Sequence, residues 1–142
     1  MMKSKRLWLT CLCVFVAIFG YDFVLHNVLL KTDYVVTGYL WRSPEEMGKY
    51  FGFLLFGQLL LSVVFCFLYA FLIDQRSSVR NGLIYGFLAG LLLSAPNFIM
   101  FTVQPMPGDL ILVKWTIGRL LQTLLAGFIL GLVYRPPSLK QL

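Results

Sequence analysis

Long hydrophobic stretches alternate with short polar segments along this chain. The hydrophobic stretches cover residues 7–30, 50–73, 83–103 and 110–134. Each has roughly the 20 residues that a helix needs to cross the hydrocarbon of a bilayer. The runs are continuous and do not alternate with polar residues, so they predict helices and not strands. We therefore expect an all-α fold: an integral membrane bundle of four transmembrane helices that forms one domain over residues 1–142.

The composition excludes several other classes of protein. Hydrophobic residues make up 59% of the 142 residues, and a soluble domain of this length buries too little surface to hide them. The formal net charge is +6, but the basic residues are scattered and form no basic face, so nucleic acid is not an expected partner. The three cysteines fall inside the hydrophobic stretches without a C-x-x-C pair, which argues against a disulfide framework. The expected surroundings are the lipid bilayer.

The distribution of Lys and Arg predicts the orientation of the helices. Seven basic residues fall on one side of a four-span protein: Lys3, Lys5, Arg6, Arg76, Arg80, Arg135 and Lys140. The connection 31–49, on the other side, carries three basic and three acidic residues. The positive-inside rule thus predicts both termini in the cytoplasm, and we expect a bacterial inner (plasma) membrane. Tyr34, Tyr39 and Trp41 are typical of aromatic anchors at the opposite interface.

The sequence Ser43-Pro44-Glu45-Glu46 predicts the start of the second helix. Serine can cap a helix, proline suits the first helical position, and a glutamate three residues after the serine completes a capping box. We therefore expect one continuous helix from Pro44 to Ile73, whose first turn and a half projects beyond the membrane.

Small and polar side chains recur at helical spacing on one face of each of the last three helices. These faces comprise Gln58, Ser62, Cys66 and Tyr69; Gly86, Gly90, Ser94 and Asn97; and Trp115, Arg119, Gln122 and Ala126. Gly86 with Gly90, and Gly127 with Gly131, form G-x-x-x-G motifs that let membrane helices approach closely. Because the two motifs lie at matched depth in consecutive helices, we expect tight packing in the cytoplasmic half.

Two ionisable side chains, Asp22 and His26, lie one turn apart in the first helix. Charged groups at membrane depth are costly, so they need a partner, a water-filled space or a function. The outer half of the bilayer should contain a polar layer with one residue from each helix: Asp22, Gln58, Asn97 and Arg119. We expect Asp22 and Arg119 to form an ion pair, with Gln122 on the face of Arg119 and His26 nearer the surface. These side chains would line a crevice open to the non-cytoplasmic side.

Each of these residues has a structural and a functional interpretation. An ion pair between Asp22 and Arg119 can fasten two helices, or it can hold a substrate or relay protons. His26 is a hydrogen-bonding group, a pH-sensitive base or, with Asp22 and Glu45, a weak candidate for a metal site. The chain has a single histidine, and transition-metal sites usually need three or four protein ligands, so we expect no metal or other cofactor. No catalytic motif assigns a catalytic residue.

These observations favour a non-catalytic function. A chain this small leaves little room for a catalytic domain outside the membrane, so we expect an accessory or assembly subunit of a membrane complex. Its expected partners are other membrane protein subunits or copies of itself. A small oligomeric transporter or channel that uses the polar layer is the alternative, and a metal-dependent membrane enzyme is a weaker one. The small and apolar residues of the cytoplasmic half argue against a pore through one copy.

Overall fold

The computed structural model describes residues 2–73, 77–103 and 109–134, and all regular secondary structure in these ranges is helical. Four long helices form the body of the molecule: α1 (Met2–Val24), α4 (Phe51–Ile73), α5 (Val79–Val103) and α6 (Asp109–Val133). The candidate membrane spans cover Lys5–Leu29, Phe51–Ile73, Val79–Val103 and Leu110–Val133. The predicted all-α membrane bundle of four spanning helices is therefore confirmed.

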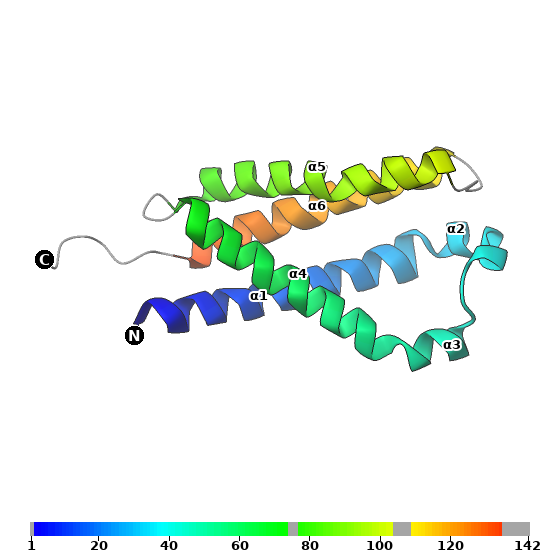
Figure 1. The fold of residues 1–142 in the computed structure, drawn as a ribbon, viewed down its shortest axis with the longest axis horizontal. Coiled ribbons are helices and arrows are strands. Elements are labelled where there is room, and N and C mark those ends of the chain that lie inside the picture. Colours follow the sequence, from blue (N-terminus) through cyan, green and yellow to red (C-terminus); the bar gives the residue numbers. More distant parts are fainter. Residues whose placement is uncertain (1, 74–76, 104–108, 135–142) are drawn as a thin grey trace, which may run out of the picture.

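The beginning of α1 and the end of α6 lie at the same end of the molecule, on the left in Figure 1. We call this end the inner end, and the opposite end, which carries the segment 31–49, the outer end. That the inner end faces the cytoplasm stays a prediction. Three of the basic residues on which it depends, Arg76, Arg135 and Lys140, lie outside the described residues.

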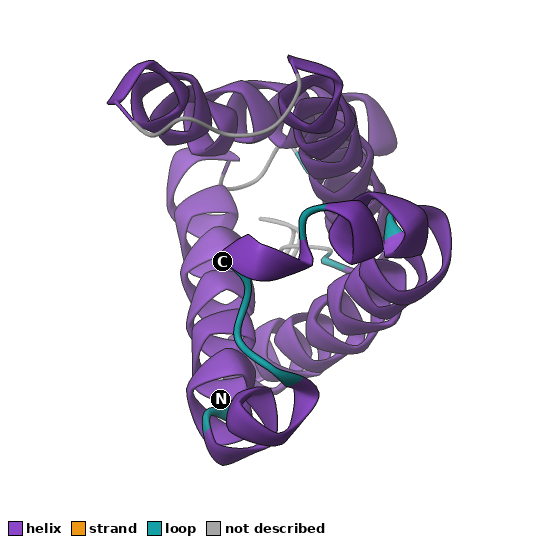
Figure 2. Cartoon of the chain, turned by 90° about the vertical axis from the view of Figure 1, so that its right-hand side faces the viewer, coloured by secondary structure: helices purple, strands orange, loops and turns teal. Residues whose placement is uncertain are grey.

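The four long helices do not pack equally against one another. α1 contacts both α4 and α6, and α5 packs along α6. Figure 1 shows α4 beside α5 at the inner end and far below it at the outer end, and Figure 2 views the same arrangement from the outer end. At their inner ends the Tyr85 hydroxyl donates a hydrogen bond of 2.8 Å to the carbonyl oxygen of Phe65. We call the divergence of these two helices the α4–α5 separation.

The apolar core lies in the inner half. It consists of buried residues of α1, α4 and α6: Cys11, Val14, Ile18, Phe65, Cys66, Tyr69, Ala126 and Leu130. The hydroxyl of Tyr69 lies 3.1 Å from Oγ of Ser77, which donates a hydrogen bond of 2.6 Å to the carbonyl oxygen of Tyr134. These contacts join α4 to the end of α6.

Glycines bring the backbones of α5 and α6 into direct contact. A Cβ atom on Gly82 would overlap the carbonyl oxygen of Gly127, and one on Gly131 would lie 2.6 Å from the Cα of Val79. The same helix contact includes the other two glycines of the predicted motifs, Gly86 and Gly90. Because a side chain at these positions would push the helices apart, the close packing depends on glycine. Gly82 belongs to the contact although the sequence interpretation left it out.

The segment between α1 and α4 folds into three short helices: α2 (Lys31–Val36), η2 (Gly38–Leu40) and α3 (Pro44–Lys49). Ser43 caps α3 by accepting a hydrogen bond of 3.3 Å from the backbone N–H of Glu46. The expectation of one helix from Pro44 to Ile73 is wrong, because the chain turns at Tyr50, where φ is −101° and ψ is 7°. Gly48 and Gly52 flank this turn, and glycine is a poor helix former.

A π-helical turn, η1 (Leu25–Leu29), extends α1 at its outer end. The backbone N–H of Leu30 donates to the carbonyl oxygen of Leu25 at 2.9 Å, which is a span of five residues instead of the usual four. Such turns hold one more residue than an α-helix and recur at functional sites. The hydrophobic pattern did not predict this turn, which contains His26.

Candidate functional site: a polar layer below an aromatic cluster

The polar residues predicted at one depth come from all four long helices. Asp22, Gln58, Asn97 and Arg119 are each half-buried, on α1, α4, α5 and α6 in turn. Gln122, one turn further along α6 than Arg119, is only 1% exposed. These five residues form what we call the polar layer.

The expected ion pair between Asp22 and Arg119 is not formed. A side-chain oxygen of Asp22 instead accepts a hydrogen bond from Nε2 of Gln58, across the contact between α1 and α4. The Arg119 guanidinium turns along its own helix and donates to Oε1 of Gln122. Within the described residues, the ion pair with an N–O distance below 4.0 Å is that of Lys114 with Asp33. Asp22 and Arg119 are therefore each bound by a neutral amide and not by the opposite charge.

Each of these two amides has one unpaired end. Gln58 uses its NH₂ group on Asp22, and its Oε1 is buried without a hydrogen-bond partner among the described residues. Gln122 uses its carbonyl group on Arg119, and in the same part of the structure its Nε2 is buried without a partner. A buried polar atom without a partner costs about 1–3 kcal/mol. The polar layer thus contains an unused acceptor on α4 and an unused donor on α6.

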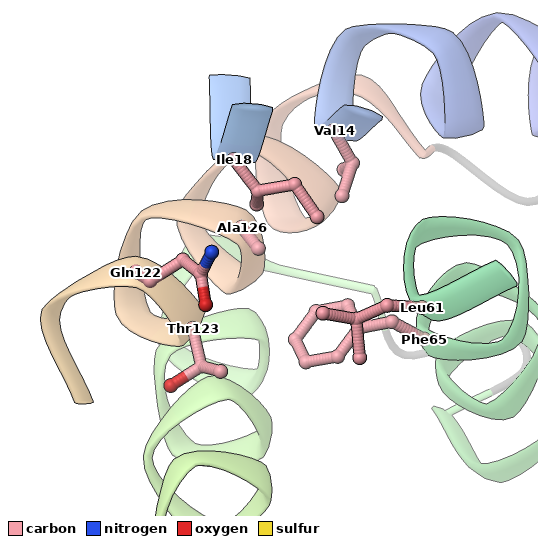
Figure 3. Close-up of a pocket in the computed structure, with 7 residues that line it drawn as sticks. All are labelled: Val14, Ile18, Leu61, Phe65, Gln122, Thr123 and Ala126. Carbon is pink, nitrogen blue, oxygen red and sulfur yellow. The ribbon is translucent and has the colours of Figure 1, made fainter. Parts of the chain in front are cut away.

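A small cavity of about 10 Å³ lies beside Gln122, in the space between α1, α4 and α6. Figure 3 shows the amide of Gln122 pointing into this space, with Thr123 and Phe65 below it and Ile18 above it. The lining is completed by Val14, Leu61 and Ala126. The volume is about that needed for a single water molecule. The unpaired donor of Gln122 therefore faces a mostly apolar pocket.

Asn97 is not brought into these hydrogen bonds. Its side chain forms none with the residues that the structure describes, and it lies near the end of α5, one turn after the buried Ser94. The predicted polar layer consists of two bonded pairs, Asp22 with Gln58 and Arg119 with Gln122, and one unbonded amide on α5.

His26 belongs to a cluster of aromatic side chains at the outer end. Its Nδ1 lies 2.6 Å from the hydroxyl of Tyr34, and the two rings stack with centroids 5.8 Å apart. Trp115 donates its indole N–H to the same hydroxyl at 2.9 Å. Because the Tyr34 oxygen already accepts from Trp115, its own proton is free to bind Nδ1 of a neutral His26. Trp41 completes this group, which we call the outer aromatic cluster, by contacting Tyr34 and Trp115 edge to face.

Further bonds stabilise the segment 31–41, one within the segment and one ion pair to α6. Trp41 donates its indole N–H to Oγ1 of Thr37 at 2.7 Å, and Lys114 binds both carboxylate oxygens of Asp33 at 2.7 and 2.8 Å. Burial raises the pKa of the Tyr34 hydroxyl above its ordinary value of 10, so it stays a proton donor at neutral pH. The sequence interpretation treated Tyr34 and Trp41 as separate interfacial anchors and placed Trp115 on a polar face. Only the folded outer segment brings the three together.

The weak metal candidates are not assembled into a ligand set. Glu45 is exposed on α3, and no group of three or more His, Cys, Asp or Glu side chains with metal-binding geometry occurs in the described ranges. Asp22 is bound by Gln58 and His26 by Tyr34. These bonds use atoms with which Asp22 and His26 would bind a metal.

Two groups of polar contacts therefore remain as the candidate site, namely the polar layer and the outer aromatic cluster above it. The first contains unpaired hydrogen-bonding atoms at membrane depth, and the second fixes the outer segment on α6. The chain matches no protein-family model, no curated protein and no solved structure.

Proposed function

We propose that this protein is a non-catalytic accessory or assembly subunit, and that it holds a transmembrane segment of a larger membrane protein at the α4–α5 separation. The observation that carries the proposal is the unpaired donor and acceptor of the polar layer, next to two helices that diverge toward the outer end. On the charge pattern of the sequence, we further propose a bacterial inner membrane with both termini in the cytoplasm.

Lipid chains are a poor covering for such a surface. They offer no hydrogen-bonding groups to the half-buried side chains of Gln58, Asn97 and Arg119. A helix from another protein can pack closely against this surface and form hydrogen bonds with its polar side chains. Small and polar residues are the ones that hold membrane helices together. Asn97 of α5, which is half-buried and unbonded to described residues, is a further polar group at this depth.

The close packing of the inner half argues against transport through one copy of the chain. Its core residues Tyr69 and Leu130 are fully buried, and Gly82 of α5 lies against Gly127 of α6. A solute would have to separate these contacts to cross. The geometry therefore favours a binding role over a conducting one.

The proposal is tested by photo-crosslinking in the membranes of the source cell. A benzophenone amino acid at Asn97 should react with one defined protein. The control position is Val16 of α1, whose side chain is 61% exposed, and there the same group should react with lipid alone. The crosslinked protein is then purified and reconstituted with this chain in nanodiscs, where the Asn97 crosslink should form again. Equal reaction at both positions, or no crosslink after reconstitution, would contradict the proposal.

A further inference from the structure

The hydrogen bonds of the Tyr34 hydroxyl require one protonation state of His26. The indole N–H of Trp115 can only donate, so in this 2.9 Å contact the Tyr34 oxygen is the acceptor. The proton of the hydroxyl is then left for Nδ1 of His26, which lies 2.6 Å away. Nδ1 can accept it only in a neutral ring that carries its own proton on Nε2. The outer aromatic cluster is therefore built for an uncharged histidine.

A second proton on His26 reverses this contact. Nδ1 becomes an N–H donor and faces the same oxygen to which Trp115 already donates. Even where the oxygen accepts from both, the Tyr34 proton loses its acceptor, and this hydroxyl has no further partner among the described residues. The ring of His26 is also half-buried, and a charge that is taken out of water is costly without a bonded partner.

The charged groups around the imidazole do not decide its state. Asp22, one turn earlier in α1, attracts a charged ring, whereas Arg119 of α6 repels it. Of the charged residues of α2, Lys31 is exposed and Asp33 is paired with Lys114 of α6. The neighbouring helix α4 contains no charged residue. Because the attraction and the repulsion act in opposite directions, the hydrogen bonds of the cluster determine which form of the ring the folded outer end accepts.

We infer that protonation of His26 opens the outer aromatic cluster and loosens the segment 31–41, which makes the cluster an acid-sensitive switch at the outer end. The contact of His26 with Tyr34 joins this segment to η1, and the contact of Trp115 with Tyr34 joins it to α6. The ion pair of Asp33 with Lys114 does not involve the imidazole and still ties the loosened segment to α6. The switch is a property of this chain alone and does not depend on the proposed partner.

The protonation states are tested by ¹⁵N NMR of the full-length protein in phosphatidylcholine bilayers. His26 is the single histidine of the chain, so the signals of its two ring nitrogens are assigned without variants. The titration runs from about pH 8 to about pH 5, the range in which histidine ordinarily gains its proton. At the upper end we expect a proton on Nε2 and none on Nδ1, and a proton on Nδ1 there would contradict the inference. The indole N–H signal of Trp115 should change together with His26, and a fixed Trp115 signal would overturn the coupling.

The loosening is measured by acrylamide quenching of tryptophan fluorescence in a Trp8→Phe background. The remaining tryptophans, Trp41 and Trp115, both belong to the cluster. The quenching constant should rise as the pH falls over the same range. Because one proton is taken up, the ratio of loosened to docked protein should change by at most about tenfold per pH unit. A constant that does not change would mean that the charged ring stays bound to Tyr34, and the inference would be wrong.

Three variants assign the response to this contact. His26→Asn places an uncharged acceptor close to the position of Nδ1, so quenching should stay low at every pH. Tyr34→Phe has no hydroxyl to release, so its quenching should be high from the start and independent of pH. Tyr39→Phe is the matched control, because Tyr39 is 78% exposed outside the cluster, and it should keep the response of the parent. An acid response of parental size in His26→Asn would mean that another group titrates. If that variant does not fold, the NMR titration of the parent decides.

Discussion

Two charged side chains in this membrane protein are bound by glutamine and not by each other. Gln58 binds Asp22 and Gln122 binds Arg119, although the opposite charges were expected to meet. An amide can bind either sign of charge because it carries both a donor and an acceptor. This pairing leaves Oε1 of Gln58 and Nε2 of Gln122 without a partner among the described residues. These two unpaired atoms are the basis of the binding proposal.

The first prediction concerns the coupling between Asp22 and Arg119. A direct buried ion pair would cost about 3–5 kcal/mol when one partner is removed, and the double variant would recover most of that. Because each charge has its own amide, Asp22→Asn and Arg119→Gln should couple by less than about 1 kcal/mol in a double-mutant cycle. Unfolding by SDS in mixed micelles measures the loss of stability in the two single variants and in the double variant. A coupling energy of about 3 kcal/mol or more would show that Asp22 and Arg119 form a direct ion pair.

The second prediction concerns the Tyr34 hydroxyl. Tyr34→Phe removes the group that bonds to His26 and Trp115 and leaves their nitrogens unpaired. We expect a loss of about 1–3 kcal/mol in the free energy of unfolding. Tyr39→Phe is the control, since Tyr39 is 78% exposed and its variant should unfold like the parent. Equal stability of the two variants would show that the cluster does not depend on this hydroxyl.

The third prediction is the pH dependence that Tyr34 imposes. Burial raises its pKa in the folded protein above the ordinary value of 10. As the pH rises past about 10, the unfolded phenol loses its proton first, the folded state binds more protons, and stability therefore falls. Alkaline unfolding followed by tryptophan fluorescence should show this loss in the parent and in Tyr39→Phe. A loss of the same size in Tyr34→Phe would mean that another group is responsible.

At the scale of helices, the pair α5 and α6 is the part most sensitive to added volume. Gly127→Ala places a methyl group against the backbone of Gly82, so we predict a loss of about 1–3 kcal/mol in the free energy of unfolding. Gly57→Ala on α4 is the matched control, because a Cβ there meets nothing within 4 Å. It should be neutral or stabilising by up to about 1 kcal/mol, since alanine favours a helix more than glycine does. Similar losses for both variants would contradict the packing argument.

The hydrophobic pattern was sufficient to predict the helices but not their polar contacts. A continuous apolar run of spanning length crosses a bilayer as a helix, because the helix pairs all of its own backbone groups, so all four spans could be predicted. Periodicity gives the face of a helix, yet not its rotation against a particular neighbour, and therefore Gln58 could not be assigned to Asp22. The hydrophobic pattern predicted neither the π-helical turn at Leu25–Leu29 nor the turn at Tyr50. The second of these has a local signal in Gly48 and Gly52, which the capping sequence at Ser43 outweighed.

As a whole, the molecule is closed at the inner end and divided at the outer end. Contacts such as that of Tyr85 with Phe65 hold α4 to α5 on one side, while the polar layer lies where they separate. We therefore expect any movement of α4 relative to α5 to be confined to their outer halves, with the core left closed.

The last prediction tests this shape with spin labels. Labels on the exposed residues Phe53 and Ile99 report the outer distance between α4 and α5, and labels on Leu72 and Leu83 report the inner one. Double electron–electron resonance should give a longer outer than inner distance. Equal distances at the two ends would refute the separation of the helices.

The π-helical turn has a consequence for natural variation in chain length. It accommodates one residue more than an α-helix, so a deletion within Leu25–Leu29 would convert it to ordinary helix. Because the wider turn absorbs that residue, the segment from Lys31 onward would keep nearly the same rotation around α1, and Tyr34 would stay close to His26 and Trp115. A divergent chain that is one residue shorter here should therefore keep all three aromatic residues, so the interval between His26 and Tyr34, eight residues in this chain, can differ by one among homologues that share this outer structure.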